Sequence, residues 1–294
     1  MSVLLRSRTT VPAEGVESGL WQRLKRQKGA MIGLRILVLV ALIVVFGPFL
    51  SPHGLDQVFW DRIEMPPDFA AGFYFGTDDN GRDLFVRTML GGRISLAVGI
   101  AAALVSLAIG TVYGAISGLI GGRVDALMMR LVDILYALPF MFFVILLAVF
   151  FGRSLVLIFV AIGAVEWLDT ARITRGQAIA LSKRDFVDAA RSYGAGRLTI
   201  LRRHILPHLL GPVVVFATLT VPRVILLESF LSFLGLGVQE PMTSWGALIA
   251  DGARLVESAP WMLAFPGGFL VVTLLAFNAL GDGVREALDP RGGS

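Results

Sequence analysis

The stretch ISLAVGIAAALVSLAIGTVYGAISGLI, residues 94–120, contains no charged residue and indicates the class of fold. A bilayer core about 30 Å thick is crossed by about 20 apolar residues in a helix. The whole chain is 55% hydrophobic and 16% charged, whereas soluble domains are about a quarter charged. The apolar residues form unbroken blocks, which favours helices over the alternating strands of a barrel. We therefore expect an all-α integral membrane protein, and not a soluble enzyme, a disordered chain or a nucleic-acid-binding domain.

Apolar blocks along the chain predict six transmembrane helices. Two of them are the weakest: residues 155–165 are short and run into Glu166 and Asp169, and residues 209–227 contain Arg223 and two prolines. The polar, basic start of the chain does not resemble a cleavable signal peptide, so the first block is expected to remain as a span. The six predicted spans are residues 31–50, 94–120, 134–151, 155–165, 209–227 and 261–280.

Lysine and arginine predict the orientation, because they concentrate in cytoplasmic loops. With the N-terminus in the cytoplasm, cytoplasmic segments hold 18 of the 26 Lys and Arg, the opposite side holds six, and Arg35 and Arg223 lie within spans. Both termini are therefore expected in the cytoplasm. The expected segments are a cytoplasmic segment with an interfacial helix (1–30), the first span (31–50), a loop on the opposite side (51–93), a helical core (94–282) and a cytoplasmic tail (283–294). The core is expected to contain a cytoplasmic loop (170–208) and a structured loop on the opposite side (229–260).

Small residues recur every four positions in the second predicted span, at Ser106, Gly110, Gly114 and Gly118. Such a row leaves one helix face almost bare, so another helix can approach closely. The neighbour is either a helix of this chain or a partner subunit, and the sequence leaves both open.

Several kinds of chemistry are missing from the sequence. No Gly-Lys-Ser/Thr sequence is present, so the chain has no P-loop for ATP. It has no cysteine, and Pro207 lies between His204 and His208, so we expect no metal site and no catalytic residues.

Ionisable residues within the predicted spans are few. Asp133, Glu166, Arg223 and Glu228 lie toward span ends, which argues against an ion-coupled secondary transporter. Arg130 and Asp133, three apart, are expected to pair. Glu228 is either an interfacial anchor or a contact for a substrate amine.

Residues 172–207, RITRGQAIALSKRDFVDAARSYGAGRLTILRRHILP, form a long basic loop. Val187, Ala190 and Gly194 recur at helical spacing and give a shallow face, and Gly194 with Gly196 ends that helix. A second short amphipathic helix follows, and Pro207 marks the entry to the next span. A small-faced helix held clear of the bilayer is suited to a cleft on another protein.

DAARSYG (188–194) followed by ILP (205–207) resembles the "EAA" loop of bacterial ABC-importer permeases, with Asp188 in place of the family's glutamate. The resemblance implies that this loop is the coupling helix that docks on a cytoplasmic ATPase. The implied coupling residues are Asp188, Ala189, Ala190, Arg191, Gly194, Ile205, Leu206 and Pro207.

Further blocks resemble the C-type permeases of the dipeptide/oligopeptide/nickel family. They are WQRLKRQK (21–28), GTDDNGRD (76–83), GGRISL (91–96), LSFLGLGVQEP (231–241) and AFNALGDGVREALDPR (276–291). The resemblance implies a type I ABC importer permease for di- or oligopeptides, and nickel chelates or glutathione-like molecules are the alternative substrates. It also implies a location in the bacterial inner membrane, so that residues 94–282 are the permease core and the loops 51–93 and 229–260 are periplasmic.

The same resemblance implies the partners: a homologous second permease, two ATPases that bind ATP and Mg, and an extracytoplasmic binding protein, with no cofactor in this chain and no nucleic acid. The candidate residues of the substrate path are Glu228, Ser229 and Asn278.

Overall fold

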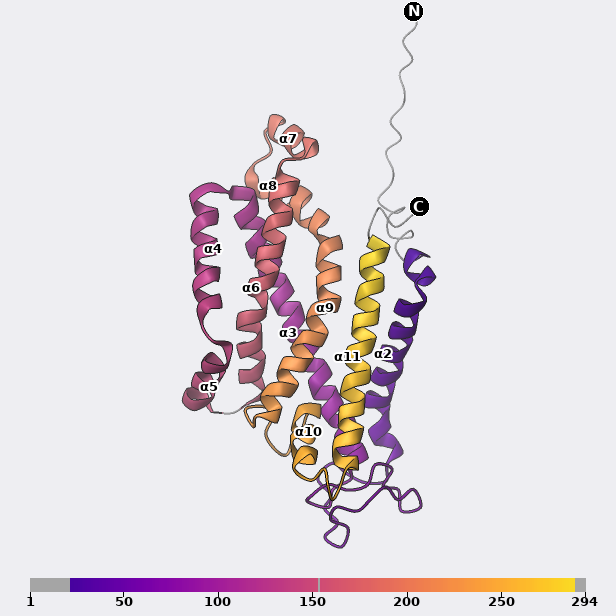
Figure 1. The fold of residues 1–294 in the computed structure, drawn as a ribbon. Helices are drawn as coiled ribbons and strands as arrows, with labels where there is room; N and C mark the ends of the chain where they lie inside the picture. The colour runs from indigo at the N-terminus through magenta and orange to yellow at the C-terminus, as the bar shows by residue number, and fades with distance from the viewer. Residues whose placement is uncertain (1–21, 153, 289–294) are drawn as a thin grey trace, which may run out of the picture.

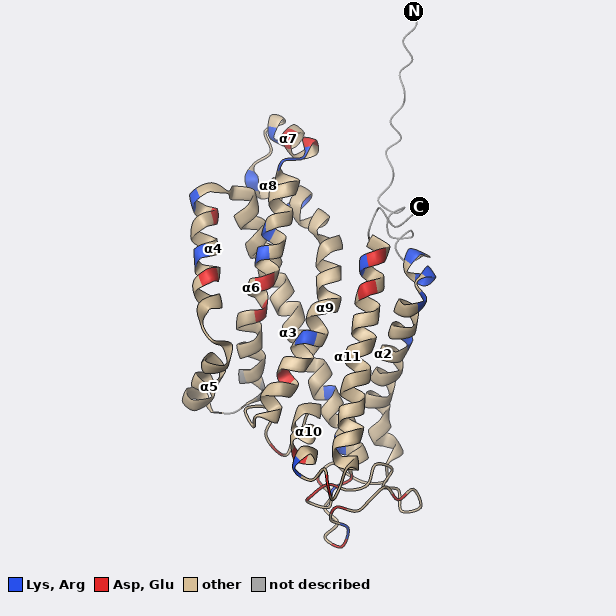
Figure 2. Ribbon diagram, viewed as in Figure 1, with Lys and Arg blue, Asp and Glu red and all other residues tan. Residues whose placement is uncertain are grey.

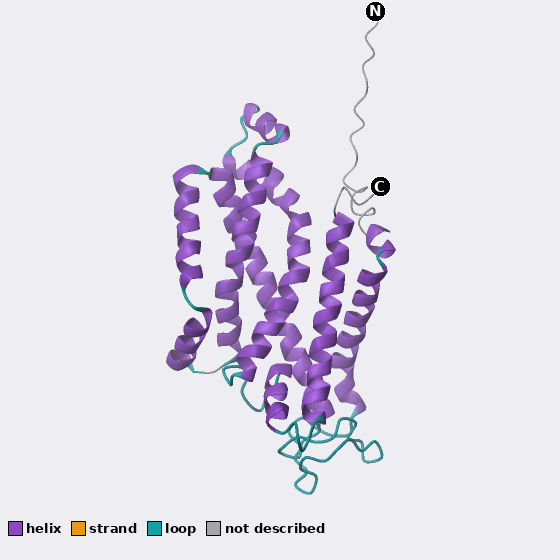
Figure 3. Cartoon of the chain, viewed as in Figure 1, coloured by secondary structure: helices purple, strands orange, loops and turns teal. Residues whose placement is uncertain are grey.

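Long helices standing side by side make up the computed structural model, which describes residues 22–152 and 154–288 (Figure 1). Among these residues the only strand pairing is in isolated bridges within the loop at one end of the bundle (Figure 3). The elements are α2 (Lys28–Phe46), α3 (Leu84–Ile120), α4 (Gly122–Ala137), α5 (Phe140–Phe151), α6 (Leu155–Ser182), α7 (Asp185–Ser192), α8 (Arg197–Ile200), α9 (Leu206–Phe233), α10 (Trp245–Arg254) and α11 (Trp261–Leu288), with a 3₁₀ turn at Gly47–Leu50 and a π-helical turn at Leu201–Ile205.

The membrane character expected from the sequence is confirmed by helix length and composition. Four helical stretches in the described part are long and apolar enough to cross a bilayer, namely Lys28–Leu50, Leu84–Ile120, Arg197–Phe233 and Trp261–Leu288. The bent pair α4 and α5 would make a fifth. Residues 22–26 are helical, and the predicted segment before residue 22 and the tail after residue 288 lie outside the described residues.

Helix α3 begins at Leu84 rather than at residue 94, so the end of the expected loop 51–93 is helical. The reason is a strong N-cap, because the side chain of Asp83 accepts hydrogen bonds from the backbone N–H groups of Phe85 and Val86. Arg87 and Arg93 therefore lie on the helix. At the other end, Gly121 with φ of 67° terminates α3.

The span expected at residues 134–151 is not one straight helix. Helices α4 and α5 are bent by 76° relative to each other, with Leu138 and Pro139 between them. Proline has no N–H to donate and its ring crowds the preceding turn, so a continuous helix breaks at this position. The break opens a space beside α6.

The small-residue row of α3 packs against α6 of the same chain, which decides between the two alternatives left by the sequence. A Cβ atom added at Gly110 would lie 2.6 Å from the carbonyl oxygen of Trp167, and one at Gly118 would lie 2.6 Å from that of Arg175. At Gly114 it would collide with the side chain of Thr174 and the carbonyl oxygen of Ala171. We call this contact the α3–α6 seam.

Residues 51–83 lie at the opposite end of the bundle from α7, and we call this the loop end (Figure 1). The predicted turns there are fastened to the helices, since Trp261 Nε1 donates to the carbonyl oxygen of Thr77 at 3.3 Å. The expected structured segment at 229–260 contains α10, whose Trp245 is fully buried and donates to the carbonyl oxygen of Thr88 at 2.9 Å.

Candidate functional site

Helix α7 projects beyond the ends of the long helices, and α8 leads from it into α9 (Figure 1). We call residues 185–205 the hairpin. Helix α7 ends where Gly194, with φ of 82°, donates to the carbonyl oxygen of Arg191 at 2.9 Å and Ala195 donates to that of Ala190 at 3.0 Å. A glycine suits this left-handed conformation because it has no Cβ atom.

One face of the hairpin is anchored and the other is free. Val187 is fully buried, and it belongs to an apolar cluster to which α3, α6 and α9 contribute Ala115, Ala178 and Leu209. Tyr193, in contrast, is 92% exposed. The hairpin is therefore held against three helices while its outer surface remains available for contact.

The predicted coupling residues divide between these two faces. Asp188, Ala189, Arg191, Gly194 and Pro207 are exposed, and Asp188 forms an ion pair with Arg191 at 2.8 Å. Ala190 and Leu206 are half-buried, and Ile205 is fully buried in the anchoring cluster. Pro207 lies in the first turn of α9, where proline is tolerated, so the chain enters the span without a separate turn.

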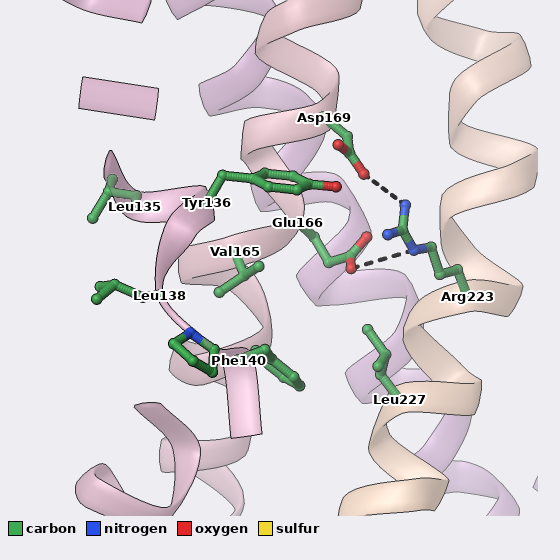
Figure 4. Close-up of a pocket in the computed structure, with 10 residues that line it drawn as sticks. Leu135, Tyr136, Leu138, Phe140, Val165, Glu166, Asp169, Arg223 and Leu227 are labelled. Carbon is green, nitrogen blue, oxygen red and sulfur yellow. Dashed lines mark hydrogen bonds and ion pairs between the residues drawn. The ribbon is translucent and has the colours of Figure 1, made fainter. Parts of the chain in front are cut away.

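A cavity of about 420 Å³ lies between the α4–α5 break, α6 and α9 (Figure 4). We call it the α6–α9 cavity. Its walls combine apolar side chains with one tyrosine and three charged groups. The lining residues are Leu135, Tyr136, Leu138, Pro139, Phe140, Val165, Glu166, Asp169, Arg223 and Leu227.

Glu166, Asp169 and Arg223 form a charged triad in this cavity (Figure 4). Arg223 Nη1 donates to Asp169 Oδ2 at 2.7 Å, and its Nε lies 3.5 Å from Glu166 Oε1. The side chain of Glu166 is 4% exposed, whereas that of Arg223 is 54% exposed. An apolar-walled cavity with a few convergent charged groups is typical of a ligand-binding site.

The one pairing expected from sequence spacing is replaced by a contact between helices. Asp133 on α4 pairs with Arg172 on α6 at 2.7 Å, rather than with Arg130 of its own helix. Arg223 pairs with α6, as described above. The sequence signal for the triad was partial, because Arg223 lies inside a predicted span and Glu166 and Asp169 follow directly after another. Its partners across α6 and α9 were not visible from spacing along the chain.

The three predicted substrate-path residues do not come together. Glu228 is 0% exposed and accepts hydrogen bonds from the hydroxyls of Ser95 and Ser232, each at 2.8 Å. Ser229 is also buried, whereas Asn278 is exposed on α11. None of the three lines the α6–α9 cavity. Their role in the path stays a prediction, and Glu228 in this conformation connects α3 to α9.

At the loop end an arginine fastens two loops together. Arg82 Nε donates to Asp78 Oδ2 and its Nη2 to Glu240 Oε1, both at 2.8 Å. The guanidinium of Arg82 holds the pKa of Glu240 below its ordinary value. Burial raises the pKa of Asp79 and of Asp251 nearby. This network positions α10 and the start of α3 relative to each other.

Most Lys, Arg, Asp and Glu residues lie toward the two ends of the bundle (Figure 2). Among the described residues no three His, Cys, Asp or Glu side chains are grouped as metal ligands. His208 Nδ1 lies 2.6 Å from the carbonyl oxygen of His204, so this ring makes a local contact.

A bundle of apolar helices with a projecting hairpin and a charged cavity between spans defines a multi-pass membrane transport component. Residues 110–292 match the family described as "binding-protein-dependent transport system inner membrane component", and residues 18–67 match the "N-terminal TM domain of oligopeptide transport permease C". The chain belongs to this family of inner-membrane transport components, and the resemblance seen in the sequence is confirmed.

Two named relatives match this chain along nearly its whole length. The oligopeptide transport system permease protein OppC of Escherichia coli (strain K12) is 58% identical over 276 residues, covering 92% of this chain and 91% of the relative. The dipeptide transport system permease protein DppC of Bacillus subtilis (strain 168) is 45% identical over 281 residues, covering 95% and 87%. These relatives are transport subunits and not enzymes.

Proposed function

We propose that this chain is the permease subunit of an ATP-driven bacterial importer for di- and oligopeptides. The observation that carries the proposal is its 58% identity, over 92% of its length, to a permease named for oligopeptide transport. A nickel-chelate or glutathione-type substrate is the alternative within the family, and the uptake experiment below separates these substrates.

The proposed topology has six spans with both termini in the cytoplasm. Helix α6 is the fourth span, although charges from Glu166 onward shorten its apolar part, and the bent pair α4–α5 is the third. Two observations support this orientation. Helix α2 begins and α11 ends at the same end of the bundle as α7 (Figure 1), and that end carries most of the Lys and Arg.

The proposed mechanism uses the hairpin as the contact to the ATPases. Two ATPase subunits bind ATP and Mg, and a second, homologous permease supplies the other wall of the path. An extracytoplasmic binding protein delivers the substrate at the loop end. Because Val187 and Ile205 anchor the hairpin to α3, α6 and α9, a displacement of α7 is transmitted to the helices around the cavity. ATP then shifts the equilibrium by favouring one docked state.

Gly194→Trp tests the docking role. The residue is exposed, nothing lies within 4 Å of the added Cβ position, and φ is 82°, so tryptophan adds both bulk and backbone strain. Gly194→Ala is the matched control, because it adds the strain with little bulk. We expect Gly194→Trp to insert normally, to lose the ATPases on purification and to lower ATP-driven trialanine uptake by more than about tenfold, an effect of at least about 1.4 kcal/mol on docking.

The outcomes separate two claims. Normal co-purification and uptake in Gly194→Trp would overturn the docking role of the hairpin. Absence of trialanine uptake by the wild-type complex, with uptake of a nickel chelate or glutathione instead, would overturn the peptide assignment.

A further inference from the structure

We propose that the α6–α9 cavity is a transit subsite for the α-ammonium group of the peptide, which displaces Arg223 from Glu166 and Asp169. The inference rests on the proposed function, and it assigns a role to three residues that were not among the predicted path residues. In the structure the guanidinium of Arg223 occupies the position that the incoming ammonium would take (Figure 4).

The charge balance of the triad carries the argument. Two carboxylates face one guanidinium, so the cavity lacks one positive charge. The distances show how the single cation is shared: Arg223 is 2.7 Å from Asp169 but 3.5 Å from Glu166, whose side chain is 4% exposed. A buried carboxylate without a close counter-ion is costly. An ammonium group placed between the two carboxylates gives Glu166 the close counter-ion that Arg223 does not provide.

The geometry permits an exchange of partners. Glu166 and Asp169 are one helical turn apart on one face of α6, so both can contact a single ammonium group. Arg223 lies on α9 and its side chain is 54% exposed, so it can turn away from α6 when it is displaced. It is then free to pair with the carboxylate of the same peptide. In both states each charged group has at least one neighbour of opposite sign, which limits the cost of the exchange in a bilayer.

The cavity also has a suitable size and lining. Its volume of about 420 Å³ lies within the range of small-ligand sites, roughly 300–1,000 Å³. The ligand meant here is a short peptide, since an extended tripeptide is only about 10 Å long. Leu138, Phe140 and Leu227 provide apolar walls without polar groups that would select one side chain. The termini, which all peptides share, are the groups that the charged residues recognise. A basic side chain of the partner permease is the competing occupant, and the tests distinguish it.

The first test removes all three charges together, as Glu166→Gln, Asp169→Asn and Arg223→Gln. If the triad only holds α6 to α9, the neutral variant has no unpaired charge and transport is retained. If the triad binds the peptide, we expect trialanine uptake by the complete importer in proteoliposomes to fall by more than about tenfold, while the yield of assembled complex stays within about twofold of wild type.

The matched control is Asp133→Asn with Arg172→Gln. This pair also joins α6 to a neighbouring helix, at 2.7 Å, but it does not line the cavity. We expect its uptake to stay within about twofold of wild type, since exposed pairs contribute about 1 kcal/mol or less. If uptake by the triple variant stays within about twofold of wild type, the subsite is overturned and the peptide assignment is not affected. Absence of uptake by the wild-type complex would overturn the peptide assignment, and the subsite with it.

The second test uses the absence of cysteine from this chain. Leu227→Cys places a thiol in the cavity wall, and Phe69→Cys places one on an exposed position of the loop end, outside the cavity and the spans. The partner subunits carry serine in place of their own cysteines. We expect a charged, water-soluble thiol reagent to modify both variants and trialanine to slow the reaction of Leu227→Cys during turnover, with no such protection at Phe69→Cys. A thiol at 227 that is inert, or that reacts equally fast with and without trialanine, would overturn the subsite and favour a contact with the partner permease.

Discussion

The two sides of α6 (Leu155–Ser182) have opposite characters. On one side its backbone lies directly against the glycines of α3, at Trp167, Ala171 and Arg175. On the other side Glu166 and Asp169 face the α6–α9 cavity. The first face leaves no room for even one added carbon atom. The second leaves about 420 Å³ and places charged groups around it. One helix thus combines a close packing surface with an open polar surface.

The difference indicates which contacts are rigid and which can change. Backbone-to-backbone packing cannot slide without clashes, so α3 and α6 are expected to move as one unit. The α6–α9 contact around the cavity depends on side-chain ion pairs, which can exchange partners. A hairpin anchored to both α6 and α9 would therefore act mainly on the second contact.

The largest expected effect comes from breaking the α3–α6 seam with Gly114→Leu. Even a Cβ atom at this position collides with Thr174 and with the backbone of Ala171. We expect loss of more than about 3 kcal/mol of stability and failure to assemble, because overpacking at backbone contacts cannot be relieved by a rotamer change. Thermal unfolding in detergent and co-purification of partner subunits measure both.

Gly176→Leu is the control for that variant, since it lies on α6 with nothing within 4 Å of the added Cβ position. Its stability should stay close to wild type. Equal stability of both leucine variants would mean that the seam is not closely packed.

The next effect compares two acids that each pair with an arginine of α6. Asp125 accepts from Arg175 Nε at 2.5 Å and Nη2 at 2.6 Å and from the hydroxyl of Ser117, and it is buried at the end of the seam. Asp133 pairs with Arg172 at 2.7 Å, with both side chains exposed. We expect Asp125→Asn to cost about 1.5–3 kcal/mol, the range for hydrogen bonds to charged groups.

Asp133→Asn should cost only about 0.2–1 kcal/mol, as exposed pairs do. Thermal unfolding of the two variants in the same detergent gives the comparison. A larger loss in Asp133→Asn than in Asp125→Asn would show that the buried pair at the end of the seam is not the stronger of the two contacts.

A smaller effect distinguishes the two neighbours of α3. Gly110→Ala brings a Cβ atom within 2.6 Å of a carbonyl oxygen of α6, and Gly99→Ala meets the side chain of Ile225 on α9. A side chain can change rotamer and a backbone cannot. We expect Gly110→Ala to cost about 1–3 kcal/mol and Gly99→Ala to cost less, measured as shifts in unfolding temperature. Equal shifts would show that both contacts of α3 yield to the same degree.

The sequence alone predicted the elements of this comparison but not their arrangement. The spacing of Gly110, Gly114 and Gly118 indicated a close helix contact, because small residues four apart share one face. The identity of the neighbouring helix depends on tertiary packing and was left open. The hairpin was predicted from Gly194, Gly196 and the shallow face around Ala190, all of which are local signals.

The cavity was missed for two physical reasons. Pro139 breaks the span expected at residues 134–151, and the resulting bend of 76° follows from proline chemistry, although its direction does not. Glu166 and Arg223 were recognised as charges near span ends, but their contact joins helices that are far apart in the chain. Spacing rules describe one helix at a time, so they suggested a pair between Arg130 and Asp133 where the structure pairs Asp133 with Arg172.

The smallest effect concerns a single hydroxyl in the seam. Thr174 Oγ1 lies 3.0 Å from the carbonyl oxygen of Gly110 across the seam and 2.7 Å from that of Thr170 in its own helix. Thr174→Val keeps the shape and removes the hydroxyl, and we expect a loss of about 0.6 kcal/mol, the average for polar contacts between membrane helices. Thr218→Val is the control, because Thr218 bonds only within α9, to the carbonyl oxygen of Val215 at 2.7 Å.

A difference of about 0.6 kcal/mol shifts the unfolding temperature of a large domain by about 1–2 °C. If packing rather than hydrogen bonding holds the seam, the two variants unfold within about 1 °C of each other. A loss above about 2 kcal/mol in Thr174→Val alone would instead make the hydroxyl a principal contact between α3 and α6.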